Sequence, residues 1–165
     1  MNKIDLIFRR RSIRKYTAEP VSQEHTEQIL RAAMAAPSAS NKQPWQFVVL
    51  SDRATINRLA DIHPHAKMLY EATLCIAVIG EKANRYSVQD CSAATQNILL
   101  AATGLGLGSV WLGVHPNPER EPMVTESLGL PETHFPLCLI AIGHPAEEKP
   151  PADRYDPSKV HYDQW

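Results

Sequence analysis

The feature that most constrains the fold of this chain is a long, compact and largely apolar helix predicted over residues 88–103. Small and aliphatic side chains such as Ala94, Ile98 and Ala101 recur along it. A helix that is apolar around most of its circumference is usually covered on several sides by other elements. We therefore expect residues 88–103 to lie at the centre of the fold, and we expect Gly104 to end the helix as residue C′.

Short apolar runs on both sides of this helix are predicted to be buried strands. They lie at residues 45–50, 74–79, 107–112 and 137–142, and Gly80 is expected to close the second of them. Further helices are predicted over residues 3–10, from an N-cap at Ser22 to Pro37, around Ile56 and Leu59, over 67–71 and over 117–128. This alternation predicts an α+β or three-layer architecture, with one modest sheet and helices on both of its faces.

The length and charge of the chain favour one ordinary globular domain. A chain of 165 residues fits a single domain over residues 1–165. The net charge of −1 gives no overall attraction to nucleic acid or to a membrane surface, and no apolar run approaches the ~20 residues of a membrane helix. Cys75, Cys91 and Cys138 match no metal or redox spacing. With no apolar core of a secretory signal, this pattern indicates reduced thiols in a cytoplasmic protein.

The end of the chain has a different composition. The sequence holds 13 prolines against 7 glycines, and prolines crowd the stretch after residue 143. Proline removes a backbone donor and interrupts helices, so residues 144–165 are expected to form an extended arm. Residues 160–165 (VHYDQW) lie beyond the proline-rich spacer but are apolar enough to pack against another surface.

Residues 9–15 carry a dense run of positive charge around Ser12. Arginine forks pair bidentately with phosphate oxygens, so this charge beside a hydroxyl suits phosphate recognition. Two other interpretations fit the same residues, namely a solvated basic face and a nucleic-acid patch. The nucleic-acid interpretation is disfavoured, because the rest of the chain supplies no matching basic stripe.

Other suggestive motifs indicate no chemistry of their own. Glycines at 104, 106 and 108 follow a helix and precede a strand, which is the reverse of a dinucleotide-binding loop, so a helix-ending turn is the simpler interpretation. The histidines, including the pair His63 and His65, show no spacing of convergent metal ligands and are expected to be ordinary loop residues. No metal site is predicted, and no nucleophile elbow or Walker A loop is present.

Four segments together resemble the FMN-dependent nitroreductase family. They are residues 10–16 (RRSIRKY), residues 36–45 (APSASNKQPW), residues 97–113 (NILLAATGLGLGSVWLG) and residues 140–145 (IAIGHP), followed by a proline-rich tail. Each segment alone is a weak signal, but their order and spacing extend over nearly the whole chain. The resemblance implies a three-layer α/β/α fold with a mixed, mostly antiparallel sheet of about four to five strands.

The resemblance also implies a function. Members of the family hold FMN at a homodimer interface, take hydride from NADH or NADPH, and reduce nitroaromatics, quinones or related acceptors in a ping-pong cycle. The flavin carries the chemistry, so no catalytic acid–base pair is expected in the chain. The alternative is a specialised or non-catalytic flavin protein, either a carrier or regulator or an enzyme of the dehalogenase, azoline dehydrogenase or flavin-fragmenting type.

By the same resemblance, eleven positions of this chain are expected to bind FMN. The residues expected at the phosphate are Arg10, Arg11, Ser12 and Arg154. Those expected at the ring are Arg14 and Lys67, at its pyrimidine edge, and the backbone of Leu112 and Gly113, near N5. Those expected to reach the flavin of the partner chain are Pro37, Ser38 and Asn41. The arm, about residues 144–165, is expected to extend to the partner subunit and to add to its sheet.

Overall fold

The chain is built around a four-stranded sheet, seen in the computed structural model, which describes residues 4–165. The strands are β1 (Trp45–Leu50), β2 (Leu74–Glu81), β3 (Gly108–Gly113) and β4 (His134–Gly143). Their order is β1-β2-β4-β3, and every neighbouring pair is antiparallel. Within residues 4–165, the only parallel pairing is an isolated bridge between Ser12 and Ser109. Strand β3 is therefore an edge strand whose outer side meets only the N-terminal segment.

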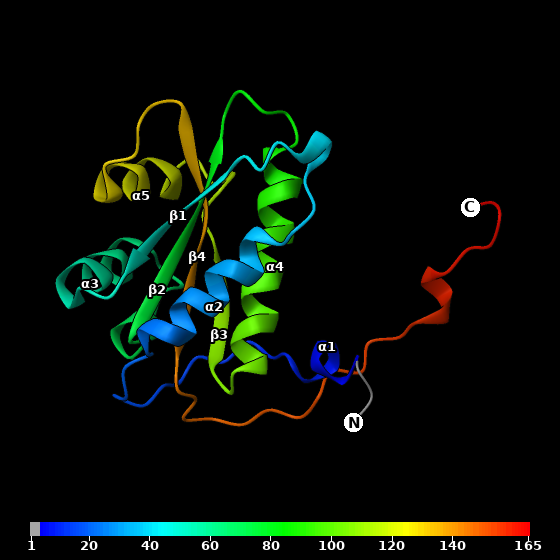
Figure 1. Ribbon diagram of the computed structural model, residues 1–165, viewed down its shortest axis with the longest axis horizontal. Coiled ribbons are helices and arrows are strands. Elements are labelled where there is room, and N and C mark those ends of the chain that lie inside the picture. Colours follow the sequence, from blue (N-terminus) through cyan, green and yellow to red (C-terminus); the bar gives the residue numbers. More distant parts are fainter. Residues whose placement is uncertain (1–3) are drawn as a thin grey trace.

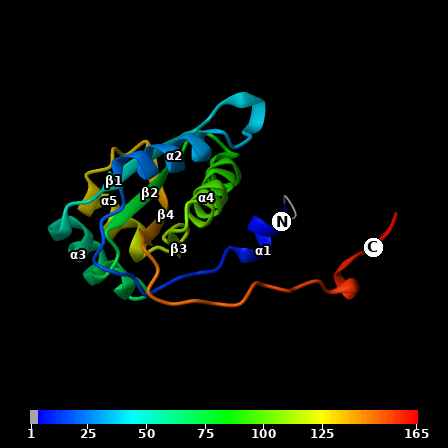
Figure 2. The ribbon, with the colours of Figure 1, turned by 60° about the horizontal axis from the view of Figure 1, so that its bottom comes forward.

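Helices cover both faces of the sheet, as predicted (Figures 1 and 2). One face is covered by α2 (Gln23–Met34) and α4 (Ser87–Gly104), and the other by α3 (Arg53–Ile62), the short helix η2 (Lys67–Tyr70) and α5 (Arg120–Leu128). Helix α1 (Asp5–Arg9) is shorter than the predicted 3–10, of which residue 3 lies outside the described residues. The arrangement is the predicted three-layer α/β/α fold.

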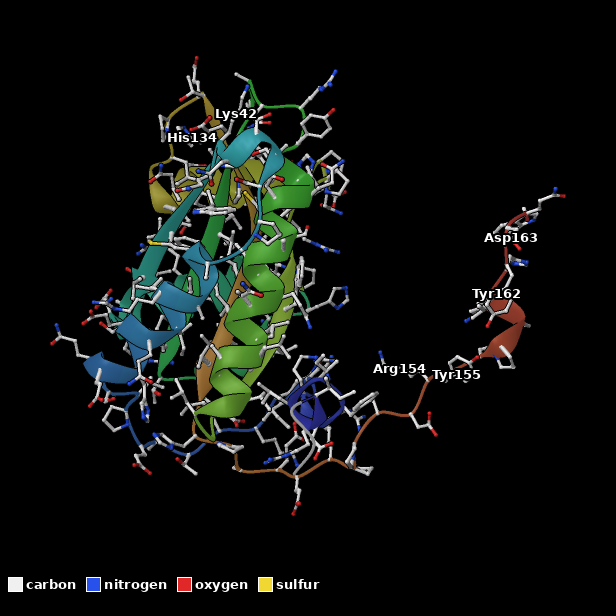
Figure 3. The ribbon with its side chains drawn as sticks, turned by 45° about the vertical axis from the view of Figure 1, so that its right-hand side comes forward. Lys42, His134, Arg154, Tyr155, Tyr162 and Asp163 are labelled. Carbon is white, nitrogen blue, oxygen red and sulfur yellow. The ribbon has the colours of Figure 1, made fainter. Side chains whose placement is uncertain are left out.

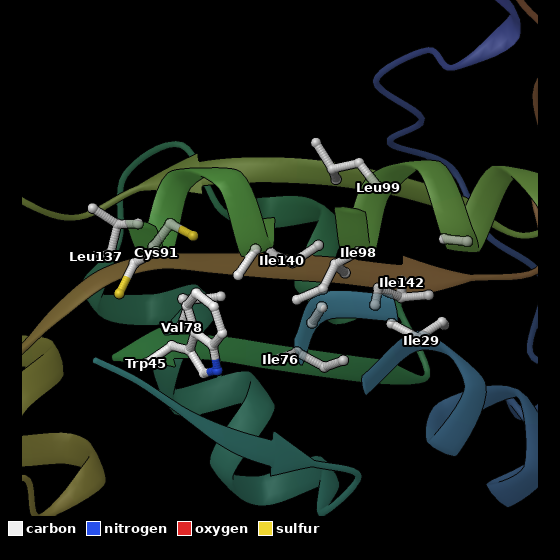
Figure 4. Close-up of a cluster of buried hydrophobic side chains, with 14 of the residues drawn as sticks. Ile29, Trp45, Ile76, Val78, Cys91, Ile98, Leu99, Leu137, Ile140 and Ile142 are labelled. Atoms are coloured by element: carbon white, nitrogen blue, oxygen red, sulfur yellow. The ribbon is translucent and has the colours of Figure 1, made fainter. Parts of the chain in front are cut away.

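An apolar core lies on each face of the sheet. Figure 4 shows the core beneath α2 and α4, where Ile76 of β2 and Ile140 of β4 lie near Ile98 of α4. Alternate residues of the same strands, such as Cys75 and Leu139, face the second core beneath α3 and α5. Because both faces are covered, β2 and β4 are apolar at nearly every position. This double burial explains why the two strands are continuous apolar runs in the sequence.

Two predicted glycine roles are wrong. Gly80 does not close β2, which continues to Glu81; a Cβ at this position would lie 2.6 Å from Cζ of Phe135, so glycine is needed for close packing. Gly104 is not residue C′ but the last residue of α4. The left-handed position after the helix belongs to Gly106, whose φ is +77°. Glycine adopts that conformation without a steric penalty.

The start of β4 also differs from the prediction. The strand begins at His134 and includes Pro136, whereas the predicted strand began at residue 137. Its pairing with β2 shifts register beside Val78, which leaves Leu137 out of the ladder. The carbonyl of Leu137 instead accepts a hydrogen bond of 3.1 Å from the N–H of Val114. Such an irregularity accommodates a proline that could not donate to a regular ladder.

Some of the other predicted boundaries are confirmed, whereas α2 ends at Met34 before Pro37, α5 begins at Arg120 instead of residue 117, and β3 lies one residue later than the predicted 107–112. The side chain of Ser22 caps α2 by accepting a hydrogen bond from the N–H of His25, and Gly129 follows α5 in the left-handed conformation. Strand β1 covers the predicted residues 45–50. Within the described part of the chain, no helix has the length and apolar character needed to cross a bilayer.

The three cysteines are all buried and free of disulfides. Burial raises the pKa of Cys75 and Cys138 to about 12, and that of Cys91 to about 11. The thiolate is the reactive form, so these side chains are poor nucleophiles at neutral pH. They act as small core residues, as the sequence predicted for reduced thiols.

The arm runs first along the N-terminal segment and then leaves the body of the molecule (Figures 1 and 2). Backbone hydrogen bonds of 2.9 Å join Thr17 to His144, Ala146 to Lys15 and Ala152 to Phe8. Beyond this stretch the chain is extended apart from the short turn η3 (Pro157–Lys159). The predicted extended conformation of residues 144–165 is confirmed, and its far end points away from the sheet.

Candidate functional site

The outer edge of β3 exposes backbone groups that no neighbouring strand uses. Ser109 accepts a hydrogen bond of 3.0 Å from the N–H of Ile13 on this outer side, whereas Val114 donates to β4. Backbone groups in a strand alternate between its two sides, so odd-numbered residues of β3 face outward and even-numbered residues face β4. The N–H groups of Trp111 and Gly113 therefore point away from the sheet.

Gly113 and Leu112, the two residues predicted near flavin N5, differ in their surroundings. Leu112 has a buried side chain, and its backbone faces β4 by the alternation described above. Gly113 is exposed, has an ordinary φ, and has no atom within 4 Å of the place where a Cβ would be. Nothing in its own chain requires a glycine at this position. The open space beside Gly113 is suited to a flat ring that approaches the backbone closely.

Three of the predicted phosphate-binding residues form a cluster of like charge. Burial lowers the pKa of Arg10, and the neighbouring charges of Arg154 and Arg11 lower it further. Within residues 4–165, no carboxylate forms an ion pair with any of these three arginines. Like charges that are gathered without an acidic partner repel one another, and a bound phosphate would remove that repulsion. The cluster therefore fits an FMN phosphate.

Ser12, the fourth phosphate residue, is held in place from both sides. Its backbone bridges to Ser109 of β3, and its carbonyl accepts a hydrogen bond of 2.7 Å from Nζ of Lys149. Lys149 also forms an ion pair of 3.1 Å with Glu147, which in turn accepts from the N–H of Arg14 at 2.6 Å. This pair, Lys149 and Glu147, could not be predicted from the sequence, because its contacts depend on how the arm folds back along the N-terminal segment.

A cavity of about 250 Å³ opens beside the basic segment. Its walls include Arg11, Ile13, the turn at Gly106 and Lys149 from the arm. The guanidinium of Arg11 also donates to the carbonyl of Pro150. The start of the arm thus forms one wall of the cavity that the basic segment lines.

The two cations predicted at the pyrimidine edge make different contacts within the chain. The guanidinium of Arg14 lies 3.5 Å from the carbonyl of Ser12. The Nζ of Lys67 donates to the carbonyl of Ala60 at 3.3 Å and lies 5.5 Å from the ring centroid of Tyr70. The contacts of Lys67 are therefore with α3 and η2 rather than with Arg14.

The loop of Pro37, Ser38 and Asn41 lies at the opposite end of α4 from the arginines. Its Ala39 N–H donates at 3.1 Å to Asp90, near the start of α4, while α1 packs beside Gly104 at the end of that helix. These two positions on α4 are roughly 20 Å apart at 1.5 Å per residue. Figure 3 shows the same separation, with Lys42 of the loop at one end and Arg154 at the other.

The loop itself is tightly built. The Oγ of Ser38 accepts from the N–H of Gln43 at 3.0 Å, and the Nε2 of Gln43 donates to Oδ1 of Asn41 at 2.8 Å. Asn41 has a positive φ of 53°. Within one chain the predicted residues therefore fall into two groups, the arginines at one end of α4 and this loop at the other.

Comparison with known proteins gives a consistent result. The sequence model of the nitroreductase family matches residues 7–66 and 62–144 of the chain. A protein of Archaeoglobus fulgidus, provisionally named an NADH dehydrogenase/NAD(P)H nitroreductase, is 44% identical over 170 residues, which cover 98% of each chain.

Solved structures agree with this relationship. An FMN-dependent nitroreductase of Clostridium difficile superposes with a TM-score of 0.94 at 33% identity, covering 98% of this chain and 99% of the other. A provisionally named nitroreductase of Desulfovibrio desulfuricans, whose crystal structure is a complex with FMN, gives a TM-score of 0.85 at 32% identity and covers 100% of this chain and 99% of the other. The similarity extends over the whole domain and includes both ends of α4.

Proposed function

Since the chain belongs to the nitroreductase family, we propose that the open edge of β3 and the arginine cluster form its flavin site. The protein is an FMN-dependent oxidoreductase that uses NADH or NADPH as the hydride donor. FMN is its cofactor. Nitroaromatics and quinones are the expected acceptors. The observation that carries the site assignment is the group of arginines that has no carboxylate partner among residues 4–165 and lies beside an exposed backbone edge.

Each residue of this edge has a separate role in the proposal. Arg10, Arg11, Ser12 and Arg154 bind the phosphate, and the N–H of Gly113 faces the reactive side of the ring. Bound FMN supplies the hydride-accepting chemistry, and the protein supplies binding, orientation and electrostatics. Arg14 places a fixed positive charge near the pyrimidine edge, where reduction builds negative charge.

The site is completed by a second copy of the chain. Pro37, Ser38 and Asn41 lie too far along α4 to reach the arginines of their own chain. In a homodimer, the loop of one protomer contacts the flavin bound by its partner. Two equivalent sites then form across a two-fold interface, in agreement with the symmetry of most homo-oligomers.

The arm supports the same assembly. Tyr155 and Trp165 have exposed fractions of 76% and 101%, and Ile7 and Phe8 of α1 are also exposed. Large apolar side chains gathered beside an extended segment commonly mark an interface with another protein. We expect the arm to cross to the partner and to add a strand to its sheet. Deletion of residues 150–165 tests this assembly by size-exclusion chromatography, and a stable, FMN-loaded dimer of the shortened chain would contradict it.

Anaerobic mixing of the purified, yellow protein with NADH or NADPH tests the proposed activity. The flavin absorbance should bleach within minutes and should return when a quinone or a nitroarene is added. Persistent yellow colour with both donors would instead favour a flavin carrier or a specialised flavin enzyme. A colourless protein that takes up no FMN would contradict the proposed site.

A further inference from the structure

His63, which follows α3, is a buried residue and not the ordinary loop histidine expected from the sequence. Its exposed fraction is 1%. Its Nδ1 accepts a hydrogen bond of 3.2 Å from the backbone N–H of His65, and its Nε2 lies 3.0 Å from the carbonyl oxygen of Gly113. A neutral imidazole donates from one nitrogen and accepts at the other. The two contacts therefore assign the proton to Nε2, which donates to Gly113.

The carbonyl of Gly113 accepts a hydrogen bond from a second donor, and the peptide group that contains it is hydrogen-bonded at both its C=O and its N–H. The guanidinium of Arg120 lies 3.2 Å from the same oxygen. The N–H of Val114, in the same peptide group, donates to Leu137 across the irregular part of β4 at 3.1 Å. Three hydrogen bonds thus set the orientation of the peptide that follows Gly113.

Glycine gives this position unusual freedom. It lacks a Cβ, so its backbone dihedral angles are restricted less than those of any other residue. Gly113 is the last residue of β3, and its own surroundings leave the Cβ side open. Its outward N–H shares a peptide group with the carbonyl of Leu112, which faces β4, so the pairing of β3 with β4 sets the direction of that N–H. The next peptide, where the strand ends, is held by the hydrogen bond from His63, supported by Arg120.

We propose that His63 is a positioning residue for the flavin site, and that its Nε2–H, by holding the Gly113 carbonyl, keeps the end of β3 in place so that the outward N–H of Gly113 meets the reactive side of the flavin ring. This inference rests on the proposed function. Burial lowers the pKa of His63, and the facing charges of Arg120 and His65 act in the same direction. The ring therefore stays neutral at physiological pH and keeps its donor role.

The first test compares His63→Leu with His63→Gln in the FMN-loaded protein. Leucine removes the donor, whereas the side-chain amide of glutamine can place an N–H near the position of Nε2. The rate constant of flavin reduction should fall roughly tenfold to a hundredfold in His63→Leu, as for a misplaced reacting group, with little change in the KM for the hydride donor. His63→Gln should recover most of the loss.

A matched control separates positioning from loss of stability. His25→Leu changes a histidine on α2, which covers the opposite face of the sheet. It should leave the reduction rate unchanged. Equal rates in wild type and in a folded His63→Leu would overturn the proposal, as would a slow His63→Gln that binds FMN normally.

The second test needs no turnover. Nitrogen-15 NMR of the full-length protein after FMN removal reports the tautomer of His63, and amide hydrogen exchange reports the order of the 113–114 segment. We expect a neutral ring protonated at Nε2, and faster exchange at Val114 in His63→Leu. A proton on Nδ1, or unchanged exchange in His63→Leu, would overturn the proposal. If the wild-type protein takes up no FMN but the tautomer and the exchange rates are as expected, the proposed function is wrong, whereas the hydrogen bond from His63 to Gly113 is confirmed.

Discussion

The central strands and the outer edge of the sheet have opposite properties. Strands β2 and β4 are paired on both sides and covered on both faces, and residues such as Ile76 and Ile140 are fully buried. Strand β3 pairs with another strand on one side only, ends in an exposed glycine and lies beside arginines that repel one another. We therefore expect stability and function to depend on different parts of one small sheet. Changes in the centre should affect folding, whereas changes at the edge should affect flavin binding and reduction.

The largest expected effect is on the stability of the centre. Ile140→Ala should lower the free energy of unfolding by about 2–5 kcal/mol, because it removes a fully buried side chain and leaves a cavity. Urea unfolding followed by circular dichroism measures the change. FMN affinity of the fraction that remains folded should be normal. A strong loss of affinity in the folded protein would break the separation between the two regions.

Removal of a phosphate ligand should have a smaller effect, confined to the edge. Arg10→Ala should weaken FMN binding by about 1.5–3 kcal/mol, which corresponds to a lost charged hydrogen bond. Its stability without FMN should not fall, since the repulsion from Arg154 and Arg11 disappears. Fluorescence titration with FMN provides the affinity. Arg31→Ala, which breaks an exposed ion pair with Glu27 on α2, is the control, and unchanged affinity in Arg10→Ala would rule out the phosphate assignment.

Gly113→Ala should slow flavin reduction while leaving the stability of the fold almost unchanged. The side chain meets no atom within 4 Å and the φ is ordinary, so Gly113→Ala should change stability by less than about 1 kcal/mol. The added methyl group would stand where the flavin approaches, so stopped-flow reduction by NADH should be slower than in wild type. Gly104→Ala, at the end of α4, where the added Cβ would make only ordinary contacts of 3.8 Å with Leu6, should be reduced at the wild-type rate. Normal reduction in Gly113→Ala would place the ring elsewhere.

The smallest effect is a pH dependence of stability from His63. Its folded pKa is lowered, chiefly by burial, so the unfolded chain binds a proton more readily. This contribution to stability is complete above the unfolded pKa of about 6.5 and is lost as the pH falls below that value. Urea unfolding at pH 7.5 and at pH 5.5 measures the difference. The decrease should be smaller in His63→Leu than in wild type, and equal decreases would contradict a neutral, buried His63.

Sequence reasoning predicted the elements well because each has a strong local pattern. The apolar helix over residues 88–103, the strand over 45–50 and the N-cap at Ser22 depend on residues close together in the chain. The role of Gly80 was not predictable, because it depends on Phe135, which reaches β2 only through the pairing of β4. Contacts that form only in the folded sheet leave no periodic signal.

The site was predictable in part. Arg10 and Arg154 were assigned by resemblance to a family, and the structure brings their charges close together from opposite ends of the sequence. Lys149 and His63 were not predictable, because each makes its hydrogen bond to a backbone carbonyl. Every residue has a backbone carbonyl, so the sequence does not indicate which carbonyl will accept a hydrogen bond. The position of Asn41 relative to the arginines likewise required the length of α4 in three dimensions.

The central claim is that the exposed edge of one chain and the loop of another form each flavin site. A heterodimer of Arg10→Ala and Asn41→Gly chains, isolated with two affinity tags, tests it directly. Glycine retains the positive φ of Asn41 while removing its side chain. If each flavin site is shared between two chains, one site of the heterodimer carries both substitutions and the other carries neither. FMN titration should then show half of the sites with wild-type affinity. If every site in the heterodimer binds FMN as weakly as one of the single variants, the flavin lies within a single chain and the account is wrong.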